Sequence, residues 1–426
     1  MFRLILSVAA GWAVQGLKRK TCDLYDYFAT GDDQIFAYKI EHKEHQVQAR
    51  WDVTDGGKKA GSLSWALNFV NEKGENRVGV TSEDHSKFYI FDPCVQAPGD
   101  RPLKLAQPVV DLTCSGKITQ PVGASFDDSN GKIYFAMFKA GLAVLDVKSA
   151  SSDAVQCYPY GDIENDFIHN VEVMNIGKNG QKRNEVFVNH LGNIWGPSGW
   201  KGRGLLWFNK KTLRFEHVIS NEEVAGAPGI SLRSAHIDAN FQSSNVIWGL
   251  TQETCPLPTK IYKFEVTATA DSVALKATLM GTLANRGTDK VVAGDGGADI
   301  ISRWNVERTE TELLATDRYG SNSGGEPALP GKIYVFSDSK SGALSSMSKL
   351  PEPTVILPTG KDGYPRRTEV LRDSWVISAN HGPPGEPLSV YAYPLEEHSA
   401  FQSPAAPAMA GYIVENGASR KEVILE

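Results

Sequence analysis

Short β-rich segments separated by polar turns recur along almost the whole chain. Val, Ile, Tyr, Phe and Trp fill the segments, and these residues favour strands. Asn, Asp, Gly and Ser fill the turns between them. The clearest copy reads IHNVEVMN, NEVFVNHLG and GLLWFN within residues 168–208. The pattern predicts a small β-sheet that is repeated many times.

Seven copies of this unit can be counted. No long helical periodicity lies between them, which argues against a parallel α/β fold. We therefore expect an all-β, single-domain, seven-bladed β-propeller. Because the first unit is short of a strand, we also expect the N- and C-terminal strands to share a blade and close the ring. The units occupy residues 24–41, 63–92, 120–147, 168–208, 231–266, 298–336 and 366–393.

Composition narrows the classes of function. The 426 residues include 40 Gly and 22 Pro, as expected of a fold with many turns. The net charge of −6 comes from 44 basic and 50 acidic residues, which leaves no strong basic field for nucleic acid. Beyond the N-terminus, no apolar run is long enough to cross a bilayer. We expect neither a nucleic-acid partner nor membrane insertion.

The first residues, MFRLILSVAAGWAVQG, resemble a secretory signal peptide, with one Arg, a short apolar stretch and small residues near Gly16. We expect residues 1–16 to be the signal peptide, residues 17–426 to be the propeller, and the protein to be secreted. The alternative is a buried first strand, in which case the protein would be cytoplasmic.

The cysteines bear on the same question. None falls in a C-x-x-C pair, so a structural zinc site is not expected. At most two disulfides can form among the five residues, and such bonds suit a secreted protein. The sequence leaves their pairing open. The cysteines are Cys22, Cys94, Cys114, Cys157 and Cys255.

Propeller geometry predicts where chemistry would gather. Residues just before the first strand of a unit and just after its second strand converge on one mouth of the central channel. Four ionisable residues satisfy this rule and should face one pocket: His169, Arg233, Glu253 and Arg318. Two Arg form a fixed positive clamp for carboxylates or phosphate, while Glu and His can move a proton. The alternative is that each merely stabilises its blade, with Arg233 and Glu253 as an ordinary ion pair.

Weaker candidates lie at related positions. His190 and His381 end second strands, and Arg366 and Arg367 start the last unit. The GDGGAD stretch at 294–299 lacks a phosphate-binding pattern and is interpreted as a turn. Neither G-x-S-x-G nor H-E-x-x-H occurs. We expect no metal and no cofactor.

At these residues the sequence resembles the lactonase-type seven-bladed propeller family, which includes bacterial 6-phosphogluconolactonases and fungal 3-carboxy-cis,cis-muconate cyclases. The matching stretches are HNVEVMN with NEVFVNHLG, LRSAHID with TQE, and DRYGSNSGGEPALPGKIYVF with ILPTGKDGYPRRTEV. By motif match, the family's His, two Arg and Glu fall on the same four residues as the geometry selected. LTQET and the insertion after Arg318 look more like the fungal cyclases.

The resemblance implies a cofactor-independent cycloisomerase that forms a lactone from a small polycarboxylate such as 3-carboxy-cis,cis-muconate, as in the catabolism of aromatic compounds. His169, Glu253, Arg233 and Arg318 would be catalytic. Arg233, Arg318, His190 and Arg366 would bind the anionic substrate. Two alternatives stay open: hydrolysis of 6-phosphogluconolactone, and a secreted propeller that binds ligands without catalysis. The sequence leaves the oligomeric state open.

Overall fold

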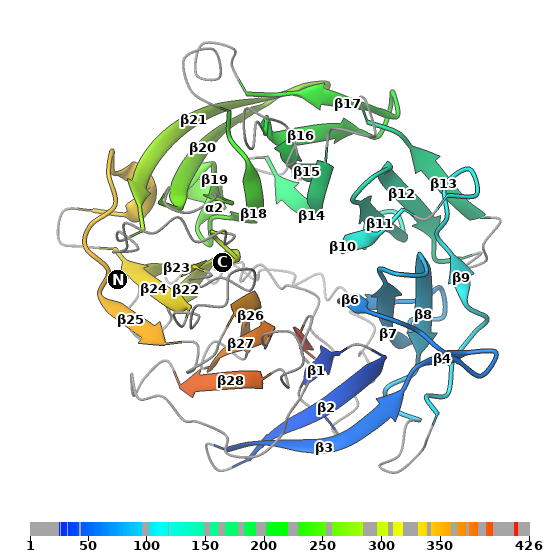
Figure 1. The fold of residues 1–426 in the computed structure, drawn as a ribbon. Helices are drawn as coiled ribbons and strands as arrows, with labels where there is room; N and C mark the ends of the chain where they lie inside the picture. The colour runs from blue at the N-terminus through cyan, green and yellow to red at the C-terminus, as the bar shows by residue number, and fades with distance from the viewer. Residues whose placement is uncertain are drawn as a thin grey trace, which may run out of the picture.

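Antiparallel sheets are arranged in a ring in the computed structural model of the protein (Figure 1). The first and last described strands belong to the same sheet, because β29 pairs with β1 in the register Phe28↔Val414. This pairing of the terminal strands is the ring closure that the sequence predicts. The structure describes residues 25, 27–31, 33–41, 44–95, 102–117, 119–148, 154–160, 167–177, 183–192, 202–219, 229–252, 258–283, 296–305, 310–317, 331–338, 342–358, 364–371, 375–381, 389–394 and 413–415.

The fold is an all-β propeller. Within a blade, strands consecutive in the chain pair side by side, and the first of them lies next to the ring's axis. The blade of β1 is the exception, because β29 takes the innermost place beside β1. The first two blades are β29 (Ile413–Glu415), β1 (Tyr27–Thr30), β2 (Gln34–Glu41) and β3 (Glu44–Asp52), and then β6 (Leu63–Val70), β7 (Asn76–Ser82), β8 (Lys87–Phe91) and β9 (Val110–Asp111). The next two are β10 (Pro121–Asp127), β11 (Lys132–Met137), β12 (Gly141–Asp146) and β13 (Val155–Tyr158), and then β14 (Phe167–Ile176), β15 (Arg183–Gly192), β16 (Gly204–Asn209) and β17 (Arg214–His217). Two more are β18 (Leu232–Ile237), β19 (Val246–Thr251), β20 (Lys260–Ala268) and β21 (Val273–Thr282), and then β22 (Asp299–Asn305), β23 (Glu310–Asp317), β24 (Lys332–Ser337) and β25 (Val355–Pro358).

The blade count differs from the sequence prediction of seven. The described residues form six four-stranded blades and one three-stranded sheet of β26 (Tyr364–Leu371), β27 (Trp375–His381) and β28 (Ser389–Pro394). The reason lies in the pairing of β29, the next described strand along the chain, which joins β1 instead of β28.

Regular structure outside the ring is sparse among these residues. A small hairpin of β4 (Thr54–Asp55) and β5 (Lys58–Lys59) follows the first blade. The helical elements are α2 (Phe241–Ser244) and a 3-10 turn at Leu344–Ser346. No helix of the described part is long and apolar enough to cross a membrane.

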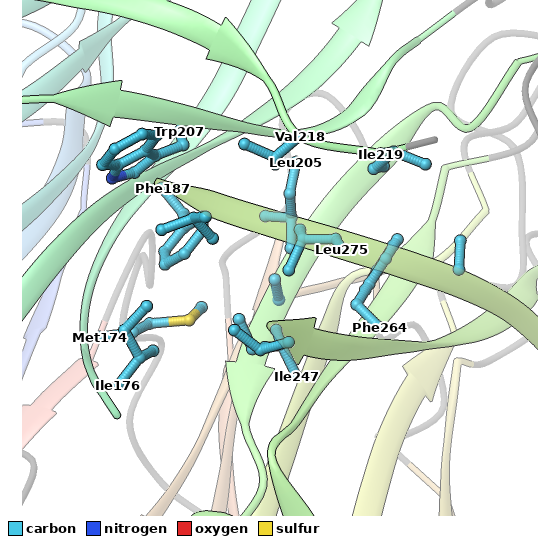
Figure 2. Close-up of a cluster of buried hydrophobic side chains, with 14 of the residues drawn as sticks. Met174, Ile176, Phe187, Leu205, Trp207, Val218, Ile219, Ile247, Phe264 and Leu275 are labelled. Carbon is cyan, nitrogen blue, oxygen red and sulfur yellow. The ribbon is translucent and has the colours of Figure 1, made fainter. Parts of the chain in front are cut away.

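The core is divided into layers between neighbouring blades. Figure 2 shows the layer between β14–β17 and β18–β21, where Phe187 of β15 packs among residues of both sheets. Alternation along a strand sends neighbours into different layers. Ile247 belongs to this layer, while Val246 and Trp248, on either side of it in β19, pack against the next blade. An inner strand such as β19 is buried along its whole length, whereas the outermost strand of the same blade, β21, alternates buried and exposed residues.

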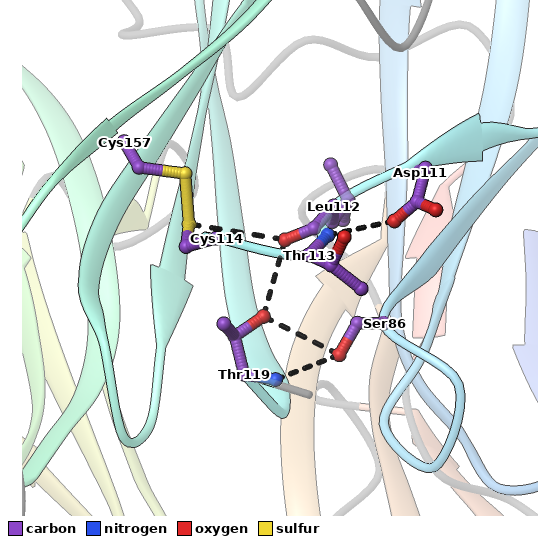
Figure 3. Close-up of a disulfide and its surroundings, with 7 residues drawn as sticks. All are labelled: Ser86, Asp111, Leu112, Thr113, Cys114, Thr119 and Cys157. Carbon is purple, nitrogen blue, oxygen red and sulfur yellow. Dashed lines mark hydrogen bonds between the residues drawn. A yellow bond between two sulfur atoms is a disulfide. The ribbon is translucent and has the colours of Figure 1, made fainter. Parts of the chain in front are cut away.

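A disulfide joins the connection between two blades to an outer strand (Figure 3). Cys114 lies just after β9 and Cys157 lies in β13, with Cα atoms 5.9 Å apart. Thr119 holds the same connection by donating its hydroxyl to the carbonyl of Leu112 at 3.1 Å. Cys94 is exposed. The predicted signal peptide and the remaining two cysteines lie outside the described residues.

The layered core predicts a large effect at Phe187. Replacing this fully buried side chain with Ala should lower the free energy of unfolding by about 3–5 kcal/mol, because the contacts of the phenyl group with both blades are lost and a cavity remains. Ile356→Ala, at a position 48% exposed on β25, is the control and should change stability by less than about 1 kcal/mol. Chemical denaturation measures both values, and equal losses would contradict the layered core.

Candidate functional site

β-Bulges place three of the predicted residues at equivalent positions. The pairing of the first two strands of a blade shifts by one residue between Ile168 and Asn170, between Leu232 and Ser234, and between Pro365 and Arg367. The extra residue is His169, Arg233 or Arg366, respectively. A bulge leaves its extra residue outside the ladder and re-aims the side chain, and bulges are common beside active sites.

These bulges lie at one end of the ring. Each occurs where the first strand of its blade begins, opposite the residues where the second strand ends, as in the pairs Ile168↔His190 and Leu232↔Thr251. This is the end at which the sequence rule places the candidate residues. The same shift occurs at Ser64 and Val122 in two further blades, and we call the end of the ring that carries these bulges the bulge end.

Arg233 is held inside the blade at this end. Its side chain is 5% exposed, and Nη1 donates a hydrogen bond to Oε1 of Gln252 at 2.8 Å. Gln252 is fixed in turn, because its backbone N–H donates to the carbonyl of Ser231 at 2.8 Å. Gln252 was not among the residues predicted from the sequence. Its place directly after the second strand, beside Glu253, was the signal that could have identified it.

His169 and Arg233 belong to adjacent blades that an amide joins. Asn189 pairs with Asn170 in the β14–β15 ladder, one residue beyond His169. The Asn189 side chain donates to the backbone carbonyl of Arg233 at 3.3 Å. The side chain of His169 is itself buried. The structure thus brings the predicted His and one predicted Arg to the same end of neighbouring blades.

A buried carboxylate links the next blades at the bulge end. Asp299 is 1% exposed, and its Oδ1 accepts a hydrogen bond from the Ser234 hydroxyl at 2.5 Å. Its Oδ2 accepts from the backbone N–H of Thr368 at 3.2 Å and lies 3.3 Å from Nε of Arg367. The guanidinium of Arg367 also lies over the Trp65 ring, 4.6 Å from its centroid. Asp299 therefore ties β18, β22 and β26 together.

This network corrects part of the sequence interpretation. Asp299 ends the GDGGAD stretch that was interpreted as a turn and lies in the predicted unit 298–336; it begins strand β22 and is, in addition, a hub of buried contacts. Arg367 was a weak candidate for binding an anion. A buried Arg–carboxylate pair is already compensated, so Arg367 holds the scaffold instead of offering a second open charge.

His190 lies in the interior of its blade. It is 0% exposed, its Nδ1 accepts the backbone N–H of Arg203 at 2.9 Å, and its ring meets that of Tyr160 edge-on at 5.2 Å. Burial, followed by the positive charges of Arg203 and His217, lowers the pKa of His190 to about 3. The imidazole is therefore neutral near pH 7 and supplies no positive charge to a substrate.

The other predicted site residues lie beyond what the structure describes. Glu253 and Arg318 are outside the described ranges, and only the backbone of Arg366 and His381 is described. The part of the chain that is described contains no group of three or more His, Cys, Asp or Glu that could hold a metal ion.

Comparison with known proteins supports the fold. No protein-family model and no curated protein matches the sequence. Among solved structures, a candidate 6-phosphogluconolactonase from Bacteroides uniformis is similar over 91% of this chain and 98% of its own, with a TM-score of 0.54 and 14% identity. U3-55K is similar over 88% of this chain and 93% of its own, with a TM-score of 0.52 and 9% identity. At these identities the likeness shows a shared β-propeller fold alone.

The burial of His190 predicts a specific pH dependence of stability. Its pKa is about 3 in the folded protein against 6.5 for the free side chain, so the unfolded chain takes up the proton first. The contribution of neutral His190 to the free energy of unfolding is complete above about pH 6.5 and is lost as pH falls toward 3. His190→Asn keeps an acceptor for the backbone N–H of Arg203 but removes the imidazole. When the pH falls from about 6.5 to 4.5, the wild-type protein should lose about 2–3 kcal/mol more stability than this variant.

Denaturation curves at the two pH values measure this difference. His85→Asn, at an exposed turn, is the matched control and should keep the wild-type dependence. A wild-type dependence in His190→Asn as well would contradict the buried, neutral imidazole.

Proposed function

We propose that the protein is a cofactor-independent enzyme that closes a lactone ring on a small polycarboxylate such as 3-carboxy-cis,cis-muconate. The observation that carries this proposal is the shared bulge position of His169, Arg233 and Arg366 at one end of the ring. Two permanent cations and a proton carrier suit a substrate with several carboxylates. Glu253 and Arg318, from the sequence resemblance, complete the proposed set.

The proposed reaction is an isomerisation. One substrate carboxylate oxygen adds to a carbon–carbon double bond, so a C–O bond forms as the π bond breaks. The electron pair moves toward the neighbouring carboxylate as an enediolate, and a proton then adds to the carbon beside it. Arg233 and Arg318 would hold the carboxylates and stabilise the enediolate charge. Glu253 or His169 would deliver the proton.

The setting of Arg233 supports its role. Gln252 orients the guanidinium from within the blade, which reduces the reorganisation needed when charge develops on the substrate. Burial around the group lowers the local dielectric, so its attraction for an anion is stronger than in water. A surface Arg would offer neither advantage.

Hydrolysis of 6-phosphogluconolactone is the second candidate, favoured by the fold likeness to the Bacteroides protein. In that reaction the Arg residues would bind the phosphate, and His169 or Glu253 would activate water for attack on the lactone carbonyl. Assays of both substrates side by side with the purified protein distinguish the two reactions.

The proposal predicts that Arg233→Ala lowers turnover of 3-carboxy-cis,cis-muconate by at least about tenfold, since an electrostatic contact made at the transition state is lost. Arg214→Ala, at an exposed position on β17, is the control and should retain wild-type turnover. Denaturation curves verify that both variants fold. A folded Arg233→Ala protein with a smaller loss would exclude the mechanism, and a wild-type protein inactive on both substrates would exclude both reactions.

We also propose a seven-bladed ring in which β26–β28 is the seventh blade. Its position supports this, because β26 contacts β22 and β23 on one side and β29 on the other. In such a ring, the innermost strand of every blade has a neighbouring blade on each side, as a closed propeller requires.

Secretion is part of the same proposal, and the Cys114–Cys157 disulfide supports it, since such bonds persist in oxidising compartments. We expect the native protein in the extracellular fraction to begin at residue 17. Intact-mass measurement of that protein tests this expectation, and a chain that retains residues 1–16 inside the cell would contradict it.

A further inference from the structure

A polar cavity of about 480 Å³, widely open to solvent, lies between the β10–β13 and β14–β17 blades. It is at the opposite end of the ring from the bulges, because its walls include Asn175 and Asn184, which pair where β14 ends and β15 begins. Most of the remaining lining comes from Asp128, Arg183, Glu185 and Lys210. The volume is in the range typical of small-molecule sites, about 300–1,000 Å³.

The cations of this cavity are already compensated. Arg183 pairs with Glu185 at 2.7 Å and donates to the carbonyls of Ala270 and Ser272. Lys210 pairs with Asp127 at 2.9 Å.

Carboxylates in and beside the cavity balance these cations. Asp127 stays ionised: burial favours its neutral form, but hydrogen bonds from Ser129, Asn184 and Lys210 lower its pKa overall. Asp128 accepts only from the neutral amide of Asn184, at 2.9 Å, among the described contacts. Within the lining, the two carboxylates Asp128 and Glu185 match the two cations, and Lys210 is also paired with Asp127. No uncompensated positive charge is left for an anionic ligand.

One acceptor in the wall lacks a donor. The side-chain oxygen of Asn175 is buried and has no hydrogen-bond partner in the described structure. Leaving a buried acceptor unsatisfied costs free energy that a ligand hydroxyl would recover. Beside it, Lys210 uses two of its three N–H groups, on Asp127 and on the carbonyl of Asn184.

The lining of the cavity therefore offers hydrogen-bond acceptors on Asp128 and Asn175 and a donor on Lys210. A hydroxyl group donates one hydrogen bond and accepts others, so adjacent hydroxyls match this alternation. We propose that the cavity binds a small, uncharged polyhydroxylated molecule of about monosaccharide size. The site is independent of the chemistry proposed at the bulge end.

Saturation-transfer NMR on the full-length protein tests the proposal, with D-glucose and myo-inositol as neutral probes. Glucose 6-phosphate and agmatine are the anionic and cationic comparisons. We expect millimolar binding of at least one neutral probe, and affinity about tenfold weaker in Asp128→Ala because an acceptor is lost. Asp271→Ala, which removes an exposed carboxylate paired with Lys211, is the matched control and should bind as wild type.

Three results would overturn the inference: no binding of either neutral probe, preference for the phosphate or the amine, or equal affinity in Asp128→Ala and wild type. Turnover at the bulge end should be unchanged in Asp128→Ala. Failure of this site and failure of the proposed enzymatic activity are thus separately visible.

Discussion

The apolar layer between neighbouring blades is the interaction on which the rest of the structure depends. A single blade has two hydrophobic faces and would expose both in isolation, whereas the ring gives each face a partner. Ile247 and Trp248 show the principle within one strand, since they pack into layers on opposite sides of their sheet. This packing holds the first strands at a common level around the axis.

The predicted site residues His169 and Arg233 lie at the same end of the ring because of that common level. When first strands are aligned, a bulge at the same point in several blades delivers its extra residue to the same end, as for His169 and Arg233. The buried Asp299 then fixes neighbouring strands through Ser234, Thr368 and Arg367. A rigid surround of this kind is what preorganised electrostatic binding requires.

Sequence patterning was sufficient for the propeller class because strands buried on both faces are apolar and their turns are polar. It missed the outermost strands of several blades, since β9 spans only Val110–Asp111 and is too short to show alternation. The burial of His190 could not be predicted, because histidine occurs both in functional sites and in protein interiors. Asp299 was missed because glycines before it resemble a turn, and its partners lie in other blades.

In the proposed function, one end of the ring forms an anion site around Arg233. A crystal structure of the protein soaked with 3-carboxy-cis,cis-muconate or its lactone tests this most directly. The account predicts a substrate carboxylate within hydrogen-bonding distance of the Arg233 guanidinium, with His169, Glu253 and Arg318 around the same molecule. A ligand bound elsewhere, or four side chains that face different surfaces, would contradict it.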